Sequence, residues 1–218
     1  YGLATVSYNN YLFLDLTGRN DWSSILASPS SSNNASFFYP SANMSAVLSE
    51  MFTLPKAISF AKLRASLSKV GSGLLVPYRT SYSYISASEF DGGLRNPTNI
   101  PNLNLKPLTT ISYELGFDLR MFKSRIGLDV ALYSSDTKDQ ILSASVDRAS
   151  GANNAIVNSG LVRNRGVEVQ LNGEILKSKK GLNWKAFGTF SANDNEVMEL
   201  TDDLSVLQIQ RGPAGKGY

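Results

Sequence analysis

Hydrophobic and polar residues alternate one by one along most of this chain. In residues 109–122, every second position from Ile111 to Met121 is hydrophobic, and the positions between them carry Ser, Glu, Gly, Asp and Arg. The same period of two recurs in residues 11–19, 62–68, 126–133, 165–176 and 182–193, and more weakly in 3–8 and 38–48. Because successive side chains of a β-strand point to opposite faces, this pattern predicts about eight strands, each with one hydrophobic face.

Charged residues are confined to one face of these predicted strands. Away from the strand ends, all of them fall on the polar faces: Asp15, Arg19, Lys62, Arg64, Glu114, Asp118, Arg120, Asp129, Glu168, Glu174 and Lys185. The opposite faces must therefore meet a medium that rejects charge, which is either a protein core or the hydrocarbon of a membrane.

The connections between the predicted strands alternate strictly between short and long. The short ones are 9–10, 49–57, 123–124 and 177–181, and the long ones are 20–37, 70–108 and 137–164. In an up-and-down barrel every second connection lies at the same end, whereas a sandwich with Greek-key crossings has no reason to sort its loops by length. Several predicted strands also run 9 to 14 residues, close to the roughly 9 to 11 of a tilted membrane strand. We therefore predict an all-β fold class, namely a segment of an antiparallel up-and-down transmembrane β-barrel.

The composition removes most enzyme chemistry. The chain has no cysteine and no histidine, so disulfides, thiol nucleophiles, zinc sites of the Cys/His type and histidine bases are excluded, and we predict no catalytic residues and no cofactor. The net charge of +3 comes from scattered basic residues, which does not indicate a nucleic-acid partner. No hydrophobic run exceeds four residues, so the sequence has no candidate transmembrane helix.

One acidic group invites a calcium hypothesis, because hard cations bind clustered oxygen ligands. It consists of Asp194, Glu196, Glu199, Asp202 and Asp203. These residues lack the ordered ligand spacing of a calcium loop. We therefore predict no metal site, and place them in a solvated outer loop.

Several sequence motifs follow one another in a defined order and spacing along the chain. In the first half they are Asn20-Asp21-Trp22-Ser23-Ser24, Phe37-Phe38-Tyr39-Pro40-Ser41, Leu48-Ser49-Glu50 and Leu63-Arg64-Ala65-Ser66. In the second half they are Asn102-Leu103-Asn104-Leu105-Lys106-Pro107, Ser112-Tyr113-Glu114-Leu115-Gly116, Arg125-Ile126-Gly127-Leu128-Asp129-Val130, Asn158-Ser159-Gly160 and Arg163-Asn164-Arg165-Gly166-Val167-Glu168. In order and spacing, these motifs resemble the SusC/RagA family of TonB-dependent outer-membrane transporters, and the match extends from about Tyr8 to Asn193.

The resemblance carries expectations about the whole protein. It implies that residues 1–218 are part of a plugged barrel of 22 strands in the outer membrane of a Gram-negative bacterium, with the plug and the TonB-contacting segment outside this chain. It also implies import of oligosaccharides or peptides, with a SusD-like surface lipoprotein capping the barrel and TonB supplying energy. The long connections would then face outward and the short turns would face the periplasm.

Aromatic residues fall into two groups under this interpretation. Tyr8, Tyr11 and Trp184 flank short turns, where a girdle at the membrane interface is expected. The second group lies on or beside the long connections, where aromatic rings could stack on sugar rings or peptide side chains. Its members are the candidate ligand-binding residues Trp22, Phe38, Tyr39, Tyr78, Tyr82, Tyr84 and Phe90.

Two alternatives to the transporter segment remain at this point. A soluble all-β ligand-binding module would bury the same hydrophobic faces in a sandwich. A small complete eight-stranded outer-membrane barrel would close on itself, which requires a last strand that pairs with the first.

Overall fold

The computed structural model describes residues 1–73, 76–178 and 181–200. Eight strands of a nine-stranded sheet pair antiparallel in chain order: β1 (Gly2–Tyr8), β2 (Leu12–Trp22), β3 (Ser36–Val47), β4 (Ile58–Ser72), β8 (Leu108–Met121), β9 (Ile126–Ser145), β10 (Asn154–Leu176) and β11 (Trp184–Glu199). The ninth strand, the two-residue β7 (Asn99–Ile100), pairs in parallel with the start of β10. Each strand pairs with the next, so the predicted up-and-down order is confirmed. β1 and β11 are the two edges of this sheet, so the described residues do not close into a barrel by themselves.

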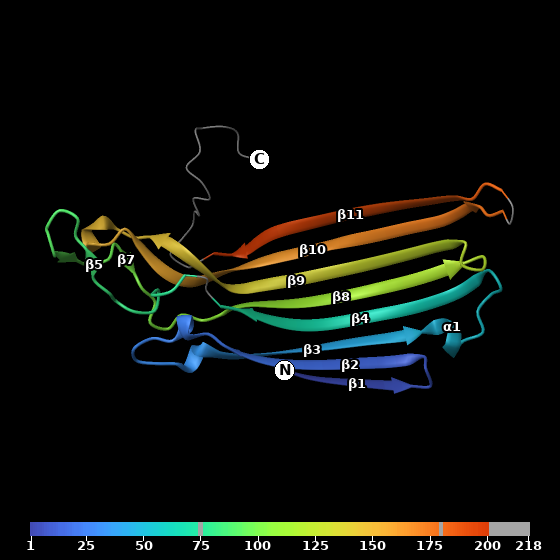
Figure 1. Cartoon of the computed structure of the whole chain (residues 1–218), viewed down its shortest axis with the longest axis horizontal. Coiled ribbons are helices and arrows are strands. Elements are labelled where there is room, and N and C mark those ends of the chain that lie inside the picture. Colours follow the sequence, from blue (N-terminus) through green and yellow to red (C-terminus); the bar gives the residue numbers. More distant parts are fainter. Residues whose placement is uncertain (74–75, 179–180, 201–218) are drawn as a thin grey trace.

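Short and long connections lie at opposite ends of the sheet (Figure 1). The short-turn end holds the β1–β2, β8–β9 and β10–β11 hairpins and the single-turn helix α1 (Leu48–Met51). The other end holds the 3-10 helices η1 (Ser24–Leu26), η2 (Asn33–Ala35) and η3 (Arg148–Ser150), and the two-residue strands β5 (Ile85–Ser86), β6 (Leu94–Arg95) and β7 (Asn99–Ile100). Among the described residues, no helix is long and apolar enough to cross a membrane.

The short turns are made by residues that accept a left-handed backbone. Asn9 and Asn10, between β1 and β2, have φ angles of 46° and 55°. Asparagine tolerates this region better than most residues, and two consecutive positive φ values match the twist of a tight hairpin. Phe122, Lys123 and Ser124 also have positive φ angles, between β8 and β9.

The prediction of a long connection at 137–164 was wrong. β9 continues to Ser145 and β10 begins at Asn154, so the hairpin extends and only residues 146–153 connect the two strands. Asp139 and Gly160 lie at the same level of the hairpin and have φ angles of 56° and 83°, while pairing resumes on both sides of them. A local irregularity therefore interrupts the ladder without ending either strand, and no alternation rule in the sequence identifies such a continuation.

The register brings the hydrophobic faces of all eight strands into continuous rows. One row crosses the whole sheet through Val6, Leu14, Met44, Ala65, Leu115, Leu132, Val167 and Ala192. The neighbouring row, one residue along and on the opposite face, consists of Thr5, Asp15, Asn43, Ser66, Glu114, Tyr133, Gly166 and Asn193. We call the first face the apolar face and the second the polar face.

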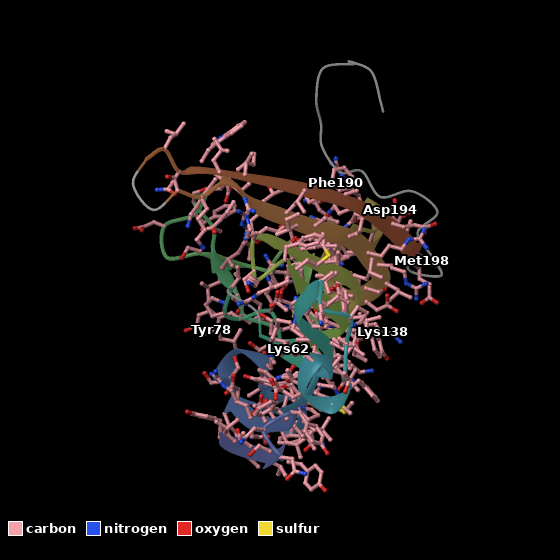
Figure 2. All side chains as sticks on the ribbon, turned by 90° about the vertical axis from the view of Figure 1, so that its right-hand side faces the viewer. Lys62, Tyr78, Lys138, Phe190, Asp194 and Met198 are labelled. Atoms are coloured by element: carbon pink, nitrogen blue, oxygen red, sulfur yellow. The ribbon has the colours of Figure 1, made fainter. Side chains whose placement is uncertain are left out.

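The sheet is a single layer with side chains on both sides (Figure 2). Large hydrophobic residues of the apolar face are exposed, among them Met44 (49%), Leu115 (47%) and Leu132 (49%). A soluble sandwich would cover this face with a second sheet, but the other sheet among the described residues is the two-stranded β5–β6 pair, which lies in the β4–β8 connection. An apolar surface of this extent is typical of a face that contacts lipid.

Adjacent residues of β4 provide a matched test of the two faces. We expect Ala65→Arg to reduce the free energy of unfolding of the full-length protein in a bilayer by about 2 to 4 kcal/mol, the cost of a cation on a lipid-facing position near the midplane. Ser66→Arg, one residue along but on the polar face, should cost less than about 1 kcal/mol. The measurement is denaturant unfolding in vesicles, followed by the heat-modifiable shift in gel mobility. Equal costs at the two positions would contradict the assignment of the faces.

Candidate functional site

Ion pairs join neighbouring side chains on the polar face. Arg64 pairs with Asp129 at 2.8 Å and Arg120 with Asp118 at 3.3 Å. At the short-turn end, Glu174 pairs with both Lys177 and Lys185. A hydrated, charge-balanced wall results, as expected for the lumen of an outer-membrane barrel.

Arg64 reaches across a whole strand to meet its partner. It lies on β4, its register partner on β8 is Gly116, and Asp129 lies beyond on β9. The guanidinium donates two hydrogen bonds to the carboxylate, of 2.8 and 2.9 Å. A Cβ at position 116 would be 2.6 Å from Arg64 Nε. The missing side chain of Gly116 is therefore what allows this bidentate pair to bridge three strands.

The outer end of the polar face carries an aromatic and ionic cluster. The rings of Phe37 and Tyr39 stack with centroids 6.0 Å apart. The Tyr39 hydroxyl donates a hydrogen bond to Asp21, which also accepts one from Arg19 Nε at 2.7 Å. The Arg19 guanidinium lies 5.9 Å from the centre of the Tyr39 ring. This cluster offers a flat aromatic surface beside charged hydrogen-bonding groups, which suits a polar organic ligand.

The long connections pack against one another instead of projecting separately. Leu26, Leu105 and Ile156 form a buried cluster with relative exposures of 2%, 0% and 5%, and Phe37 and Ile141 pack on it. The three central residues come from the β2–β3 connection, the β4–β8 connection and the extended part of β10. We call residues 23–35, 73–107 and 140–159, apart from the undescribed 74–75, the outer unit.

One asparagine side chain ties two parts of the outer unit together. Asn158 Oδ1 accepts a hydrogen bond from the Lys106 backbone N–H at 2.8 Å, and its Nδ2 donates to the Lys106 carbonyl at 2.9 Å. The same Nδ2 also donates to the Asp139 carbonyl at 3.0 Å. Two sequence motifs, 102–107 and 158–160, are thus in direct contact.

Further side chains satisfy the backbone of the outer unit. Asn34 Nδ2 donates to the carbonyls of Asn104 and Leu105, at 3.3 and 3.0 Å. Thr80, which is 4% exposed, donates its hydroxyl to the Ala27 carbonyl at 2.6 Å. Buried backbone groups need such partners where no strand supplies them, so the outer unit has a defined structure of its own.

Comparison with known proteins identifies the family of this sheet with one apolar and one polar face. The family model for the β-barrel of TonB-dependent receptor-like proteins matches residues 1–213. The chain belongs to this family. The resemblance to TonB-dependent transporters, drawn from the motifs above, is thereby confirmed.

Relatives of the TonB-dependent receptor barrel are known in sequence and in structure. The chain is 30% identical over 209 residues to TonB-dependent receptor P26 of Formosa agariphila, covering 92% of this chain and 20% of that protein. It is 27% identical over 210 residues to TonB-dependent receptor P3 of the same organism. The chain therefore spans about a fifth of the length of these relatives.

A solved structure shows the same fold. The RagAB peptide transporter aligns with a TM-score of 0.81 and 22% identity, over 92% of this chain and 22% of the matched chain. The up-and-down strand order and the similarity to this structure exclude a soluble sandwich as the fold of this segment. The match to only 22% of the larger chain argues against a small closed barrel. The fold class predicted from the sequence is confirmed.

The structure separates the seven aromatic candidates. Trp22 and Phe38 lie on the apolar face near the outer ends of β2 and β3, and are 75% and 58% exposed. They are therefore on the opposite face of the sheet from Tyr39. Tyr39 lies on the polar face. The other four are exposed on the β4–β8 connection, namely Tyr78 (78%), Tyr82 (64%), Tyr84 (69%) and Phe90 (73%).

The acidic group is not an outer loop within the described residues. Asp194, Glu196 and Glu199 lie on β11, where Asp194 pairs with Arg165 at 2.9 Å. Asp202 and Asp203 lie outside the described residues. Up to residue 200, leaving out the gaps at 74–75 and 179–180, no group of three acidic residues could hold a metal ion.

Gly116 provides a test of the ion pair that crosses β8. We expect Gly116→Ala to displace Arg64 and to reduce the free energy of unfolding of the full-length protein by about 1 kcal/mol, the upper end for a partly exposed pair. The control is Gly188→Ala on β11, where a Cβ would meet no atom within 4 Å. There the added methyl should be neutral or stabilising by up to about 1 kcal/mol, because glycine weakens a strand. If both variants are equally stable, Gly116 is not required for the pair.

Asn158 provides a test of the outer unit. We expect Asn158→Ala to remove the side-chain hydrogen bonds to both backbone groups of Lys106, at a local cost of about 0.5 to 1.5 kcal/mol for each bond. Hydrogen exchange of the Lys106 amide in the full-length protein should then accelerate on the order of tenfold to a hundredfold. Asn104→Ala, which removes an exposed side chain from the same segment, should leave this rate unchanged. Unchanged exchange in the Asn158 variant would show that the connection is held in place by other contacts.

Proposed function

We propose that the full-length protein is a TonB-dependent importer of the outer membrane that takes up oligosaccharides or peptides. This segment forms part of the barrel wall and part of the barrel rim. Its apolar face contacts lipid, and its polar face borders the lumen. The outer unit faces the extracellular side and the short turns face the periplasm. We propose no enzymatic activity for it, and the plug and the TonB-contacting segment belong to other parts of the protein.

The observation that carries this proposal is the pair of adjacent rows across all eight strands. Every member of the first row, from Val6 to Ala192, is hydrophobic, and no member of the second, from Thr5 to Asn193, is aliphatic. Such a sheet suits a barrel wall that has hydrocarbon on one side and a polar interior on the other. Membership of the TonB-dependent receptor family supports energised import as the task of the whole protein.

We propose a SusD-like surface lipoprotein as the partner on the extracellular side, with TonB acting through the parts of the protein outside this chain. The support is the outer unit, which presents exposed aromatic rings on a packed base and so loses little conformational freedom on binding. Solved RagAB structures are described as a peptide transporter and importer, which favours peptides among the two substrate classes proposed.

Residues for ligand or partner contact can be ranked by their position. Tyr78, Tyr82, Tyr84 and Phe90 on the outer unit are the proposed contacts at the entrance, and Tyr39 is the proposed contact within the lumen. Trp22 and Phe38 are assigned to the membrane interface instead.

The experiment measures uptake and growth in the producing organism. Deletion of the gene should abolish growth on one class of polymer, either glycan or protein digest, and leave growth on free monosaccharides or amino acids intact. In the full-length protein, Tyr82→Ala combined with Tyr84→Ala should lower the affinity for ligand or for the lipoprotein by at least about tenfold, because exposed aromatic anchors contribute about 2 kcal/mol or more each where they are hot spots.

The matched control is Tyr8→Ala, which removes an exposed aromatic ring at the short-turn end. It should leave ligand affinity, lipoprotein affinity and uptake unchanged. Normal growth of the deletion strain on every polymer would contradict the proposed import. Unchanged affinities in the Tyr82/Tyr84 variant would contradict only the proposed contacts.

A further inference from the structure

The short connections are far more basic than the long ones. By sequence, the connections 9–11, 48–57, 122–125 and 177–183 contain one acidic residue, Glu50, against the basic residues Lys56, Lys123, Arg125, Lys177, Lys179 and Lys180. The connections at the opposite end of the sheet, 23–35, 73–107 and 146–153, are nearly balanced, with Arg79, Arg95, Lys106 and Arg148 against Glu89, Asp91 and Asp147. Among the described residues, the rim at the short-turn end carries Lys56, Lys123, Arg125 and Lys177 against Glu50, a net positive charge that import through the lumen does not explain.

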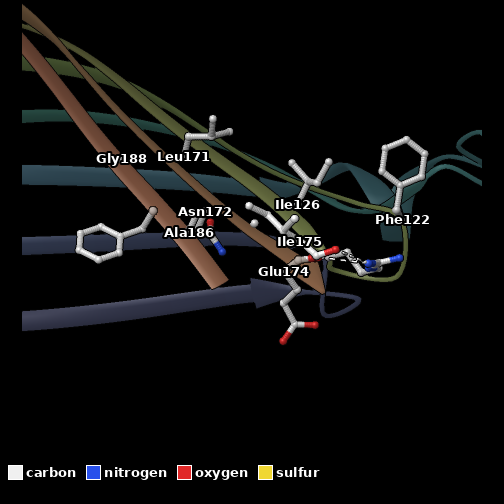
Figure 3. Close-up of a pocket in the computed structure, with 11 residues that line it drawn as sticks. Phe122, Ile126, Leu171, Asn172, Glu174, Ile175, Ala186 and Gly188 are labelled. Atoms are coloured by element: carbon white, nitrogen blue, oxygen red, sulfur yellow. Dashed lines mark hydrogen bonds between the residues drawn. The ribbon is translucent and has the colours of Figure 1, made fainter. Parts of the chain in front are cut away.

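A hollow of about 610 Å³ opens beside this rim. Two rows of the apolar face line this hollow. One row contains Leu171 and Gly188, and the next contains Ile126, Gly173 and Ala186. Figure 3 shows Leu171, Ile126 and Phe122 on one side of the strands, with the Glu174 carboxylate pointing away from them. The hollow exists because two glycines and an alanine stand where neighbouring rows carry larger side chains, and a Cβ at Gly188 would meet no atom within 4 Å.

Cations border the hollow at its rim. Arg125 lines it and is anchored there by hydrogen bonds of 3.2 Å from its guanidinium to the carbonyls of Glu174 and Ile175. Those two bonds use only part of its five N–H donors. The one carboxylate of the lining, Glu174, is paired with both Lys177 and Lys185, so this corner of the protein has a net positive charge.

We propose that this hollow binds an anionic phospholipid, with an acyl chain along Leu171, Gly188 and Ile126 and the phosphate group against Arg125 and Lys123. An apolar groove that ends at a cation matches the chemistry of a lipid with a hydrocarbon tail and a negative head. Exposed aromatic rings at the same rim, Tyr8, Phe122 and Trp184, mark the level at which headgroups lie.

Charge complementarity selects lipid over a second copy of the protein as the occupant. A symmetric contact between two copies at this patch would bring the same basic rim together twice. Like charges within a Debye length of about 8 to 10 Å repel each other. An anionic lipid, by contrast, neutralises the rim and fills the hollow in one step.

The test uses the full-length protein purified in detergent, with phosphatidylglycerol as the anionic probe and phosphatidylcholine as the zwitterionic probe. Native mass spectrometry counts bound lipids during titration. The wild type should bind phosphatidylglycerol more tightly than phosphatidylcholine. Lys123→Gln and Arg125→Gln should each lower the phosphatidylglycerol affinity about fivefold, since each cation near an anionic lipid surface raises the binding constant by about that factor. Gly188→Leu, which fills the hollow, should lower the affinity for both lipids.

The control is Arg148→Gln, which removes a cation from the opposite end and should leave lipid binding unchanged. The heat-modifiable shift verifies that every variant is folded. Equal affinity of the wild type for the two lipids, or wild-type binding by the Arg125 variant, would overturn the proposal. The proposal would also be overturned if the Gly188→Leu variant bound lipid like the wild type but no longer formed a dimer, because the hollow would then be a contact between two copies of the protein. None of these outcomes depends on substrate uptake.

Discussion

The pairing of every backbone polar group within the membrane is the constraint on which this structure depends. Hydrocarbon offers no hydrogen bonds, so a sheet can cross only if each strand is paired with its neighbours. Once pairing is fixed, the period of two fixes the faces as well: a slip of one residue between β4 and β8 would bring the Glu114 row to the lipid and the Leu115 row to the lumen. The register is therefore set by the distribution of charge along each strand, and one strand determines the next across the whole sheet.

That constraint explains how much could be predicted from the sequence. Alternation and the confinement of charge give the strands, their faces and the up-and-down order, because all of these follow from local periodicity and short turns. The ends of strands are harder to predict from the sequence. For example, β10 was predicted to begin at residue 165, but it begins at Asn154. Beyond the hydrocarbon a strand needs only a pairing partner, and residues such as Ile141 and Ile156 serve the outer unit instead of the alternating faces.

The outer unit was the main feature that the sequence analysis missed. Leu105 was seen only as part of the family-like motif 102–107, yet it is completely buried in a cluster with Leu26 and Ile156, and its carbonyl accepts a hydrogen bond from Asn34. Contacts between residues far apart in the sequence, such as Asn158 with Lys106 (52 positions) and Asn34 with Leu105 (71 positions), produce no periodic pattern in the sequence. The resemblance of 102–107 and 158–160 to family motifs was the available signal, and the hydrogen bonds between them supply its physical reason.

The two ends of the sheet are stabilised by different means. Within the described residues, the buried hydrophobic side chains are Leu26, Ala61, Ala87, Leu105, Ala144, Ala152 and Ile156, and all but Ala61 belong to the outer unit or to strand segments next to it. Packing of protein against protein thus fixes the outer end. The short-turn end has tight hairpins, exposed aromatic rings and basic residues, and its apolar rows end in a hollow instead of a core. The short-turn end therefore has no protein core among the described residues, and its exposed apolar rows are suited to contact with an apolar medium.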